Sequence, residues 1–219
     1  MTLFALSPPQ PHTTESGTRA ALFDGRLAFL RVEQDGRWNP NAPRPTAVLP
    51  GSFNPLHEGH RSLARAAGDL LGMPVAFELS IANVDKPPLG PDVVRQRLAA
   101  FAWQAEVWLT RAPTFVEKAR LFPNAVFVIG IDTAARILAP RYYPGGTEIA
   151  MTTALGDIRE SGCRFLVGGR VDSGGLFVEL ADLPIPVHCA DLFQAVPRHV
   201  FRADISSTHL RATTGVQRK

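Results

Sequence analysis

A strand, a glycine-containing turn and a helix follow one another over residues 46–71, and this succession constrains the fold more than any other feature of the sequence. The apolar run 46–50 predicts a strand, and residues 61–71 have the pattern of a helix. Between them, residues 51–60 read GSFNPLHEGH. A turn of this kind, leading from a strand into a helix, presents backbone N–H groups to a phosphate. The sequence therefore predicts an α/β unit with an anion site.

Two histidines, His57 and His60, stand at the end of this turn. Because they are three residues apart, they share one face of the first helical turn. Alone, such a pair is more often a surface or partly buried pair than a functional one. The GSFNP turn directly before it shifts the balance towards chemistry on an anion.

Strands and helices alternate beyond this unit. Further strands are predicted over residues 75–81, 107–110, 125–130 and 164–168, and further helices over 91–103, 115–121, 132–139 and 148–160. Repeated βα units predict an α/β fold, a Rossmann-like doubly wound parallel sheet with helices on both faces. Ligands of such sheets bind outside the carboxyl ends of the strands, near a reversal of strand order.

Several polar residues follow strand ends and are candidates for that site: His57, Asn83, Lys86, Asp132 and Arg170. Lys86 fits a solvated surface lysine and a ligand-binding lysine about equally. Asp132 could cap the following helix, but its place directly after a buried strand favours a nucleotide contact. Arg170 fits a plain turn arginine slightly better than a phosphate-binding residue.

Residues 1–45 form an N-terminal arm before the domain of residues 46–219. Residues 1–19 are rich in Pro, Thr and Ser and are predicted to be poorly ordered. Asp24-Gly25 between apolar runs predicts a β-hairpin, and the prolines of residues 35–45 indicate a linker. Packing on a sheet edge, homo-oligomerisation and a remnant of a fused domain all remain open as roles of the arm.

Composition narrows the function classes. The net charge of +3 includes no Lys/Arg block, which argues against a nucleic-acid partner. No apolar run could span a bilayer, and the first residues lack the pattern of a signal peptide, so a cytoplasmic protein is expected. Cys163 and Cys189 show no metal-ligand spacing and are predicted to be small buried residues. Trp103 and Trp108 are predicted to lie in the core.

A second motif lies near the C-terminus, where residues 205–211 read ISSTHLR. Ser206 or Ser207 would be a helix N-cap, and Gly215 would end that helix. Arg211 follows Ser207 by four residues and so shares its face. Alone, the motif predicts no more than a capped helix. Together with the first motif, it predicts a second phosphate site.

The two motifs resemble those of the nucleotidyltransferase superfamily, (H/T)xGH and ISSTxxR. Both are complete here, at residues 57–60 and 205–211, and the resemblance covers residues 46–215. Within the superfamily, Gly51-Ser52-Phe53-Asn54-Pro55 resembles the opening loop of nicotinamide/nicotinate mononucleotide adenylyltransferases. Gly130-Ile131-Asp132 resembles their GxD motif. The loops 83–89 and 168–172 match only loosely, so the acceptor stays open.

The resemblance implies transfer of AMP from ATP to a mononucleotide, with NMN or its acid form as the best candidate, and release of pyrophosphate. It implies that His57 and His60 act on the α-phosphate and that Arg211 holds the leaving pyrophosphate. The implied nucleotide-binding residues are Gly51, Ser52, Phe53, Asn54, Gly130, Asp132, Ser206, Ser207 and Thr208, and the implied acceptor-binding residues are Asn83, Lys86 and Arg170.

Mg²⁺ is expected to arrive with ATP, bound mainly by phosphates and water rather than by a protein cage. A cytidylyltransferase, a phosphopantetheine adenylyltransferase and a non-catalytic nucleotide-binding module remain as alternatives. A class I tRNA synthetase also carries a motif of the HxGH type, but this chain is short and has no matching lysine-rich second signature.

Overall fold

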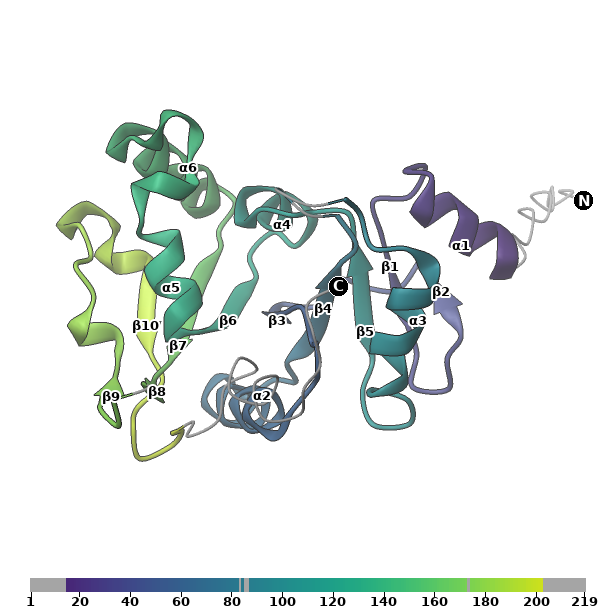
Figure 1. Ribbon diagram of the computed structural model, residues 1–219, viewed down its shortest axis with the longest axis horizontal. Coiled ribbons are helices and arrows are strands. Elements are labelled where there is room, and N and C mark those ends of the chain that lie inside the picture. Colours follow the sequence, from purple (N-terminus) through teal and green to yellow (C-terminus); the bar gives the residue numbers. More distant parts are fainter. Residues whose placement is uncertain (1–14, 83, 85–86, 173, 203–219) are drawn as a thin grey trace, which may run out of the picture.

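The computed structural model describes residues 15–82, 84, 87–172 and 174–202, and an eight-stranded sheet runs through its centre (Figure 1). Six of the strands are mutually parallel: β3 (Ala47–Pro50), β4 (Ala76–Ser80), β5 (Val107–Thr110), β6 (Val126–Gly130), β7 (Arg164–Gly168) and β10 (Phe193–Ala195). Their order is β5-β4-β3-β6-β7-β10. The order reverses between β3 and β6, which makes this the switch point of a doubly wound sheet.

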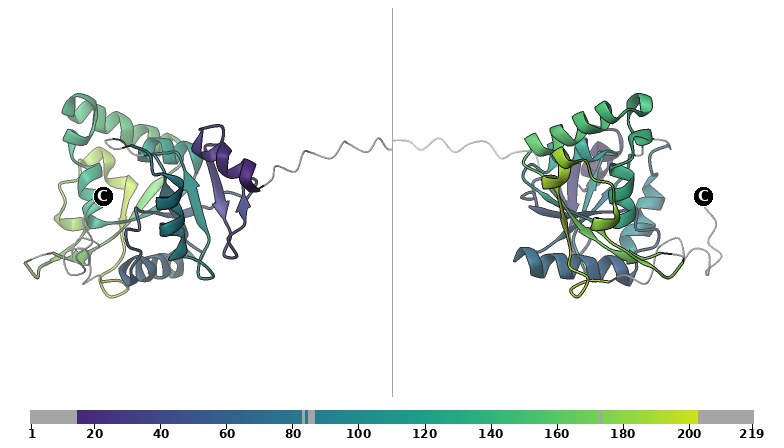
Figure 2. Two further views of the ribbon diagram at one scale, coloured as in Figure 1. Left: turned by 45° about the vertical axis from the view of Figure 1, so that its right-hand side comes forward. Right: turned by 90° about the vertical axis from the view of Figure 1, so that its left-hand side faces the viewer.

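Helices cover both faces of the sheet, as predicted (Figure 2). On one face α2 (Glu58–Leu71) and α3 (Pro91–Ala99) bury Leu63 and Val94 against Leu49 and Val128 of the sheet. The other face is covered by α4 (Phe115–Leu121), α5 (Ile131–Ile137) and α6 (Glu148–Glu160), whose apolar side chains pack against Val48, Phe127 and Phe165. Adjacent residues of one strand thus enter different cores, because side chains alternate across a strand.

Short elements complete the region after α5. Four 3₁₀ helices, η1 (Pro140–Tyr142), η2 (Pro144–Gly146), η3 (Leu180–Asp182) and η4 (Val187–Leu192), connect the longer elements. A small antiparallel hairpin of β8 (Arg170–Val171) and β9 (Phe177–Val178) follows β7. Strands β8, β9 and β10 were not predicted from the sequence. Each has only two or three residues, too few for a hydrophobic period to appear.

The predicted hairpin at Asp24-Gly25 is wrong, and so is the prediction of poor order for residues 15–19. Residues Glu15–Phe23 form helix α1, and Asp24-Gly25 lies just after its end. A hairpin does occur further on, between β1 (Phe29–Val32) and β2 (Trp38–Asn39). Its turn contains the second Asp-Gly pair, Asp35-Gly36, inside the segment interpreted as a linker.

The arm adds an antiparallel edge to the sheet, because β1 pairs with β5 along its whole length. Arg111, just after β5, donates from Nη1 to the carbonyl of Phe23 at 3.0 Å and so caps the carboxyl end of α1. Of the three roles left open for the arm, packing on a sheet edge is the one that the structure displays. The predicted parallel sheet is confirmed for its five predicted strands, and it is extended by the parallel strand β10 and by these two antiparallel ones.

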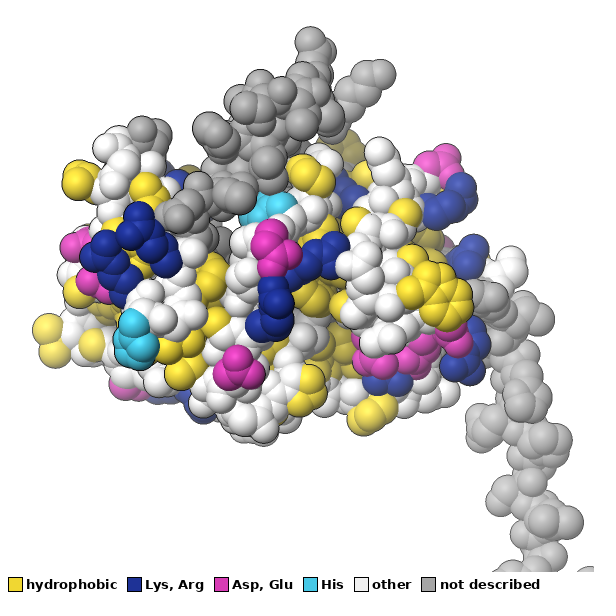
Figure 3. Space-filling view, turned by 90° about the horizontal axis from the view of Figure 1, so that it is seen from below, with side chains coloured by type: hydrophobic (Ala, Val, Ile, Leu, Met, Phe, Trp, Pro, Cys, Tyr) yellow, Lys and Arg dark blue, Asp and Glu magenta, His cyan; other side chains and the backbone are white. Residues whose placement is uncertain are grey.

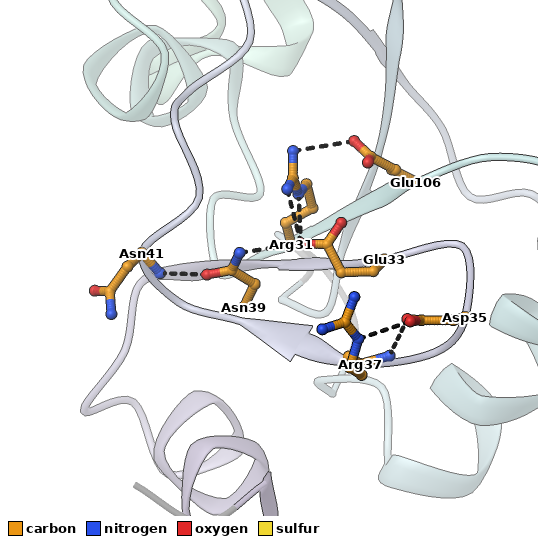
Figure 4. Close-up of polar contacts among 7 residues, drawn as sticks. All are labelled: Arg31, Glu33, Asp35, Arg37, Asn39, Asn41 and Glu106. Atoms are coloured by element: carbon orange, nitrogen blue, oxygen red, sulfur yellow. Dashed lines mark hydrogen bonds and ion pairs between the residues drawn. The ribbon is translucent and has the colours of Figure 1, made fainter. Parts of the chain in front are cut away.

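A polar network joins the hairpin to β5 (Figure 4). Arg31 of β1 bridges two carboxylates, with Nη2 2.7 Å from Glu33 and Nη1 3.1 Å from Glu106. Asn39 of β2 donates to the same Glu33 at 3.0 Å. The network therefore ties both arm strands to the edge of the parallel sheet.

One ion pair is buried in the centre of the fold. Lys118 of α4 donates to both carboxylate oxygens of Glu78 in β4, each at 2.8 Å, and to the carbonyl of Ala112 at 2.7 Å. Thr110 donates to Glu78 at 2.5 Å. Glu78 is fully buried and Lys118 is 5 % exposed. Every charge in this cluster is thus matched by a partner, as burial demands.

The predicted core is largely confirmed, with one exception. Trp108 is 1 % exposed, and both cysteines are buried. Trp103 is 76 % exposed, because α3 ends at Ala99 and Trp103 lies beyond it with a positive φ of 61°. Among the residues that the structure describes, none of the helices has both the length and the apolar character that a membrane crossing requires.

Candidate active site

The loop after β3 lies at the switch point, and its backbone is shaped by Phe53. Phe53 is 2 % exposed, and its backbone has a φ of +43°, a conformation that residues other than glycine rarely adopt. Its ring makes edge contacts with His60, Phe77 and Phe101. A Cβ on Gly51 would lie 2.7 Å from this ring, so only glycine fits there. The buried ring thus holds the exposed Ser52 and Asn54 in place.

His57 and His60 meet at the start of α2. His57 is the N-cap and His60 is the third residue of the helix, and their rings stack with centroids 3.7 Å apart. The backbone N–H of His57 donates to Nδ1 of His60 at 3.3 Å. The prediction that the two side chains share one face is confirmed, although the helix begins at Glu58 rather than at Arg61.

His60 is neutral at physiological pH. Burial lowers its pKa to about 3, with smaller contributions from the neighbouring His57 and Arg61. Because Nδ1 accepts a hydrogen bond, the proton of the neutral ring is on Nε2. His60 can therefore offer one directed N–H donor to an anion.

Three glycines stand at the same level at the carboxyl edge of neighbouring strands. Gly130 of β6 pairs with Gly168 of β7. Ala47 and Val48 of β3 pair with Val126 and Phe127 of β6. Counted on in this register, Gly51, the residue after β3, corresponds to Gly130. At Gly51 and Gly168 neighbouring side chains fill this space, whereas a Cβ on Gly130 would meet no atom within 4 Å. The backbone at Gly130 is therefore the part of this edge that is open to a ligand.

Asp132 and Arg170 form an ion pair at this edge. Arg170 donates from Nε to Oδ2 of Asp132 at 2.5 Å and from Nη2 to Oδ1 at 2.9 Å. The hydrogen bonds with Asp132 raise the pKa of Arg170. Asp132 is the second residue of α5, whose N-cap is Gly130, so it is not the capping residue. The structure thus joins two residues that were predicted to make separate ligand contacts.

Arg97, which was not predicted as a site residue, is a neighbour of this loop. It lies in the last turn of α3 and donates from Nη1 to the carbonyl oxygen of Ser52 at 2.9 Å. Nothing in the local sequence distinguishes it from Arg95, two residues earlier on the same helix. Only the packing of α3 beside the 51–57 loop reveals the contact.

The other predicted site residues lie outside the described part of the chain. These are Asn83, Lys86, Ser206, Ser207, Thr208 and Arg211. Phe201, which lies shortly before the second motif, is close to the site. It packs against Gly168 at the end of β7, as does Leu63 of α2. A Cβ on Gly168 would meet Leu63 at 2.6 Å and Phe201 at 2.9 Å. Figure 1 shows the segment after β10, in yellow, running towards α2.

The outer face of α2 is a solvated, mixed-charge surface. Seen from below, basic and acidic side chains lie next to one another over this helix, and a histidine is visible beside them (Figure 3). Glu58 forms an ion pair with Arg65 and accepts a hydrogen bond from Ser62 at 2.9 Å. Arg61 donates to Gln104 and to the carbonyl of Ala100. Glu58 and Arg65 thus neutralise each other, while Arg61 is held by two neutral oxygen acceptors.

Within the described ranges, no group of three or more His, Cys, Asp or Glu side chains is arranged to hold a metal ion. Asp132, the carboxylate nearest the switch point in sequence, is bound by Arg170.

The model of the cytidylyltransferase-like family matches residues 48–213, which include both motifs. The chain belongs to this family. Membership supports a nucleotidyltransferase activity in general, and the mostly parallel, doubly wound sheet agrees with it. A comparison with curated proteins found no match.

Proposed function

We propose that this family member transfers AMP from ATP to the phosphate of a mononucleotide and releases pyrophosphate. NMN or nicotinate mononucleotide is the proposed acceptor, which places the reaction in NAD biosynthesis. The stacked pair His57–His60 at the start of α2, directly after the loop at the switch point, is the observation that carries this proposal. It puts imidazole donors where sheets of this topology bind nucleotides.

In the proposed reaction, an oxygen of the acceptor phosphate attacks the α-phosphorus of ATP. The bond from that phosphorus to the oxygen bridging the α- and β-phosphates breaks, and pyrophosphate leaves. His60 donates a hydrogen bond through Nε2 to the α-phosphate as negative charge builds. His57 donates a hydrogen bond to the same phosphate. The backbone at Ser52 and Phe53 lines the same phosphate. The protein's part is positioning and charge stabilisation rather than covalent chemistry.

The leaving pyrophosphate is assigned to the second motif, through Ser206, Ser207, Thr208 and Arg211. Support comes from the described chain just before it, where Phe201 packs beside Leu63, one helical turn after His60. Ser206 follows Phe201 by five residues, and five residues span at most about 18 Å. The covalent connection therefore allows both motifs to act on one triphosphate.

Mg²⁺ would enter with the nucleotide and be coordinated mainly by phosphate oxygens and water. When bound, it supplies positive charge to the β- and γ-phosphates. The chain's own residues orient the nucleotide. Asn83 and Lys86 remain proposed acceptor contacts, and the Asp132–Arg170 pair is proposed to face the nucleotide together with Gly130.

The test is release of pyrophosphate by the full chain with Mg²⁺. ATP and CTP are each combined with NMN, nicotinate mononucleotide, phosphopantetheine and other phosphate-bearing acceptors. ATP with NMN or nicotinate mononucleotide is expected to give the highest kcat/KM. Arg211→Ala is expected to raise the KM for ATP, with Arg198→Ala, an exposed arginine of the same region, as the control.

Two other outcomes would replace the proposal. The description of the family makes cytidylyl transfer the second candidate, and higher kcat/KM with CTP than with ATP would establish it. Binding of ATP without pyrophosphate release for any acceptor would instead indicate a nucleotide-binding module.

A further inference from the structure

Arg97 places a guanidinium group on the side of the 51–57 loop that faces β4 and α3. Its Nη1 donates to the Ser52 carbonyl at 2.9 Å. The loop cannot easily move away, because the buried ring of Phe53 contacts Phe77 and Phe101, the latter just beyond α3. The position of the guanidinium relative to the loop is therefore fixed by packing.

The charge of Arg97 is not balanced by a carboxylate in the described part of the chain. No Asp or Glu of that part lies within ion-pairing distance of it, whereas Arg31, Arg95 and Arg170 each have such a partner. Partial burial of the guanidinium lowers the pKa of Arg97. An arginine nevertheless keeps its charge at neutral pH. A partly desolvated cation thus lies against the loop that carries the candidate catalytic residues.

We propose that Arg97, held against the Ser52 carbonyl, binds the phosphomonoester group of the acceptor substrate. This inference rests on the proposed function and names the contact that selects the acceptor. One of the five N–H donors of the guanidinium is used by Ser52, so a parallel pair remains for two phosphate oxygens. The third oxygen is then directed at the α-phosphorus held by His57 and His60.

In this arrangement the two substrates lie on opposite sides of β3. The nucleoside triphosphate occupies the β6 side, along Gly130 and the switch point, and the acceptor occupies the β4 side, beside Arg97. The positive charge of Arg97 also offsets the repulsion between the acceptor phosphate and the triphosphate. An acceptor without a phosphate has neither the nucleophile nor the group that Arg97 recognises.

The first test compares steady-state kinetics of Arg97→Gln and Arg97→Lys with the control Arg95→Gln. Arg95 lies on the same helix, is exposed and pairs with Asp92 at 3.1 Å. Arg97→Gln is expected to raise the KM of the acceptor by about 10-fold or more, the scale of a lost charge-assisted hydrogen bond, with the KM for ATP nearly unchanged. Arg97→Lys, which keeps the charge and loses the fork, is expected to be intermediate.

Two kinetic results would overturn the inference. An unchanged acceptor KM in Arg97→Gln shows that the guanidinium does not contact the acceptor. A lower kcat in Arg97→Gln, with the KM of both substrates unchanged and a lower Tm, shows that Arg97 only tethers the loop. Arg95→Gln is expected to behave as the unaltered protein in both respects.

The second test does not need turnover. Calorimetry measures the affinity for inorganic phosphate while α,β-methylene-ATP occupies the triphosphate site. Arg97→Gln is expected to lose phosphate binding and Arg95→Gln to keep it. If no acceptor supports pyrophosphate release but this pattern is found, the proposed function fails and the phosphate site stands. If turnover is found and phosphate affinity is equal in all variants, the function stands and the assignment of Arg97 fails.

Discussion

The backbone N–H of His57 donates to Nδ1 of His60 over 3.3 Å, and the two rings stack 3.7 Å apart. This hydrogen bond decides which nitrogen of His60 carries the proton, because an accepting Nδ1 leaves the proton on Nε2. Burial keeps the ring neutral by lowering its pKa to about 3. His60 is thus a hydrogen-bond donor of fixed orientation, which is the form that the proposed reaction requires.

Replacing His60 by alanine is expected to lower kcat by about 10²-fold or more, the scale of losing one preorganised donor. ATP binding, measured by calorimetry, should be largely kept, since the triphosphate retains its other contacts. His199→Ala, which removes an exposed histidine, serves as the control and should leave kcat unchanged. A His60→Ala protein with full turnover would contradict the role given to this ring.

The lowered pKa of His60 also predicts a pH dependence of stability. The folded-state pKa is about 3 and the usual value is 6.5, so between these values the unfolded chain binds a proton that the folded protein does not. The stability associated with neutral His60 is present above pH 6.5 and is lost as the pH falls towards 3. One site contributes at most about 1.4 kcal/mol per pH unit.

Urea unfolding between pH 7 and pH 5 measures this effect. The free energy of unfolding of the unaltered protein should fall more steeply with decreasing pH than that of His60→Asn, which cannot titrate. His199→Asn should follow the unaltered protein. Parallel pH profiles for the unaltered protein and His60→Asn would show that His60 is not protected from protonation.

Gly168→Ala is expected to destabilise the protein by about 1–3 kcal/mol, because overpacking forces neighbours to shift. The new Cβ would meet Leu63 at 2.6 Å and Phe201 at 2.9 Å. Since Phe201 leads into the second motif, the KM for ATP should rise as well. Gly156→Ala in α6, where a Cβ meets no atom within 4 Å, is the control and should be neutral or stabilising. Equal stability and ATP KM in the two variants would contradict this prediction.

Lys118→Met is expected to cost about 3–5 kcal/mol of unfolding free energy, since it leaves the carboxylate of Glu78 buried without a partner. Replacing both members, as Glu78→Gln with Lys118→Met, should recover part of this loss. Arg120→Gln on the same helix removes an exposed ion pair with Asp157 and should cost less than about 1 kcal/mol. Chemical unfolding of the four proteins measures all three effects, and a small loss in Lys118→Met alone would show that the pair is not sealed from water.

Local patterns were enough to predict most of the elements. The apolar run of β6, the strand before the 51–57 loop and helix α6 were predicted because each has a period or a run long enough to identify it. The arm was predicted less well, since two Asp-Gly pairs occur there and nothing local distinguishes the pair after a helix from the pair within a hairpin. The exposure of Trp103 was missed because α3 ends at Ala99 without a glycine or proline to mark it.

The sequence by itself determined the class of fold, the place of the His57–His60 pair after the first strand of the domain and the likeness to nucleotidyltransferases. These depend on residues close together in the chain, whose spacing sets their relative positions. Only the tertiary structure decided that Arg170 binds Asp132 and that Arg97 holds the Ser52 carbonyl. Both contacts join residues about 40 positions apart, and their geometry arises from how neighbouring strands and helices pack, which no local pattern encodes.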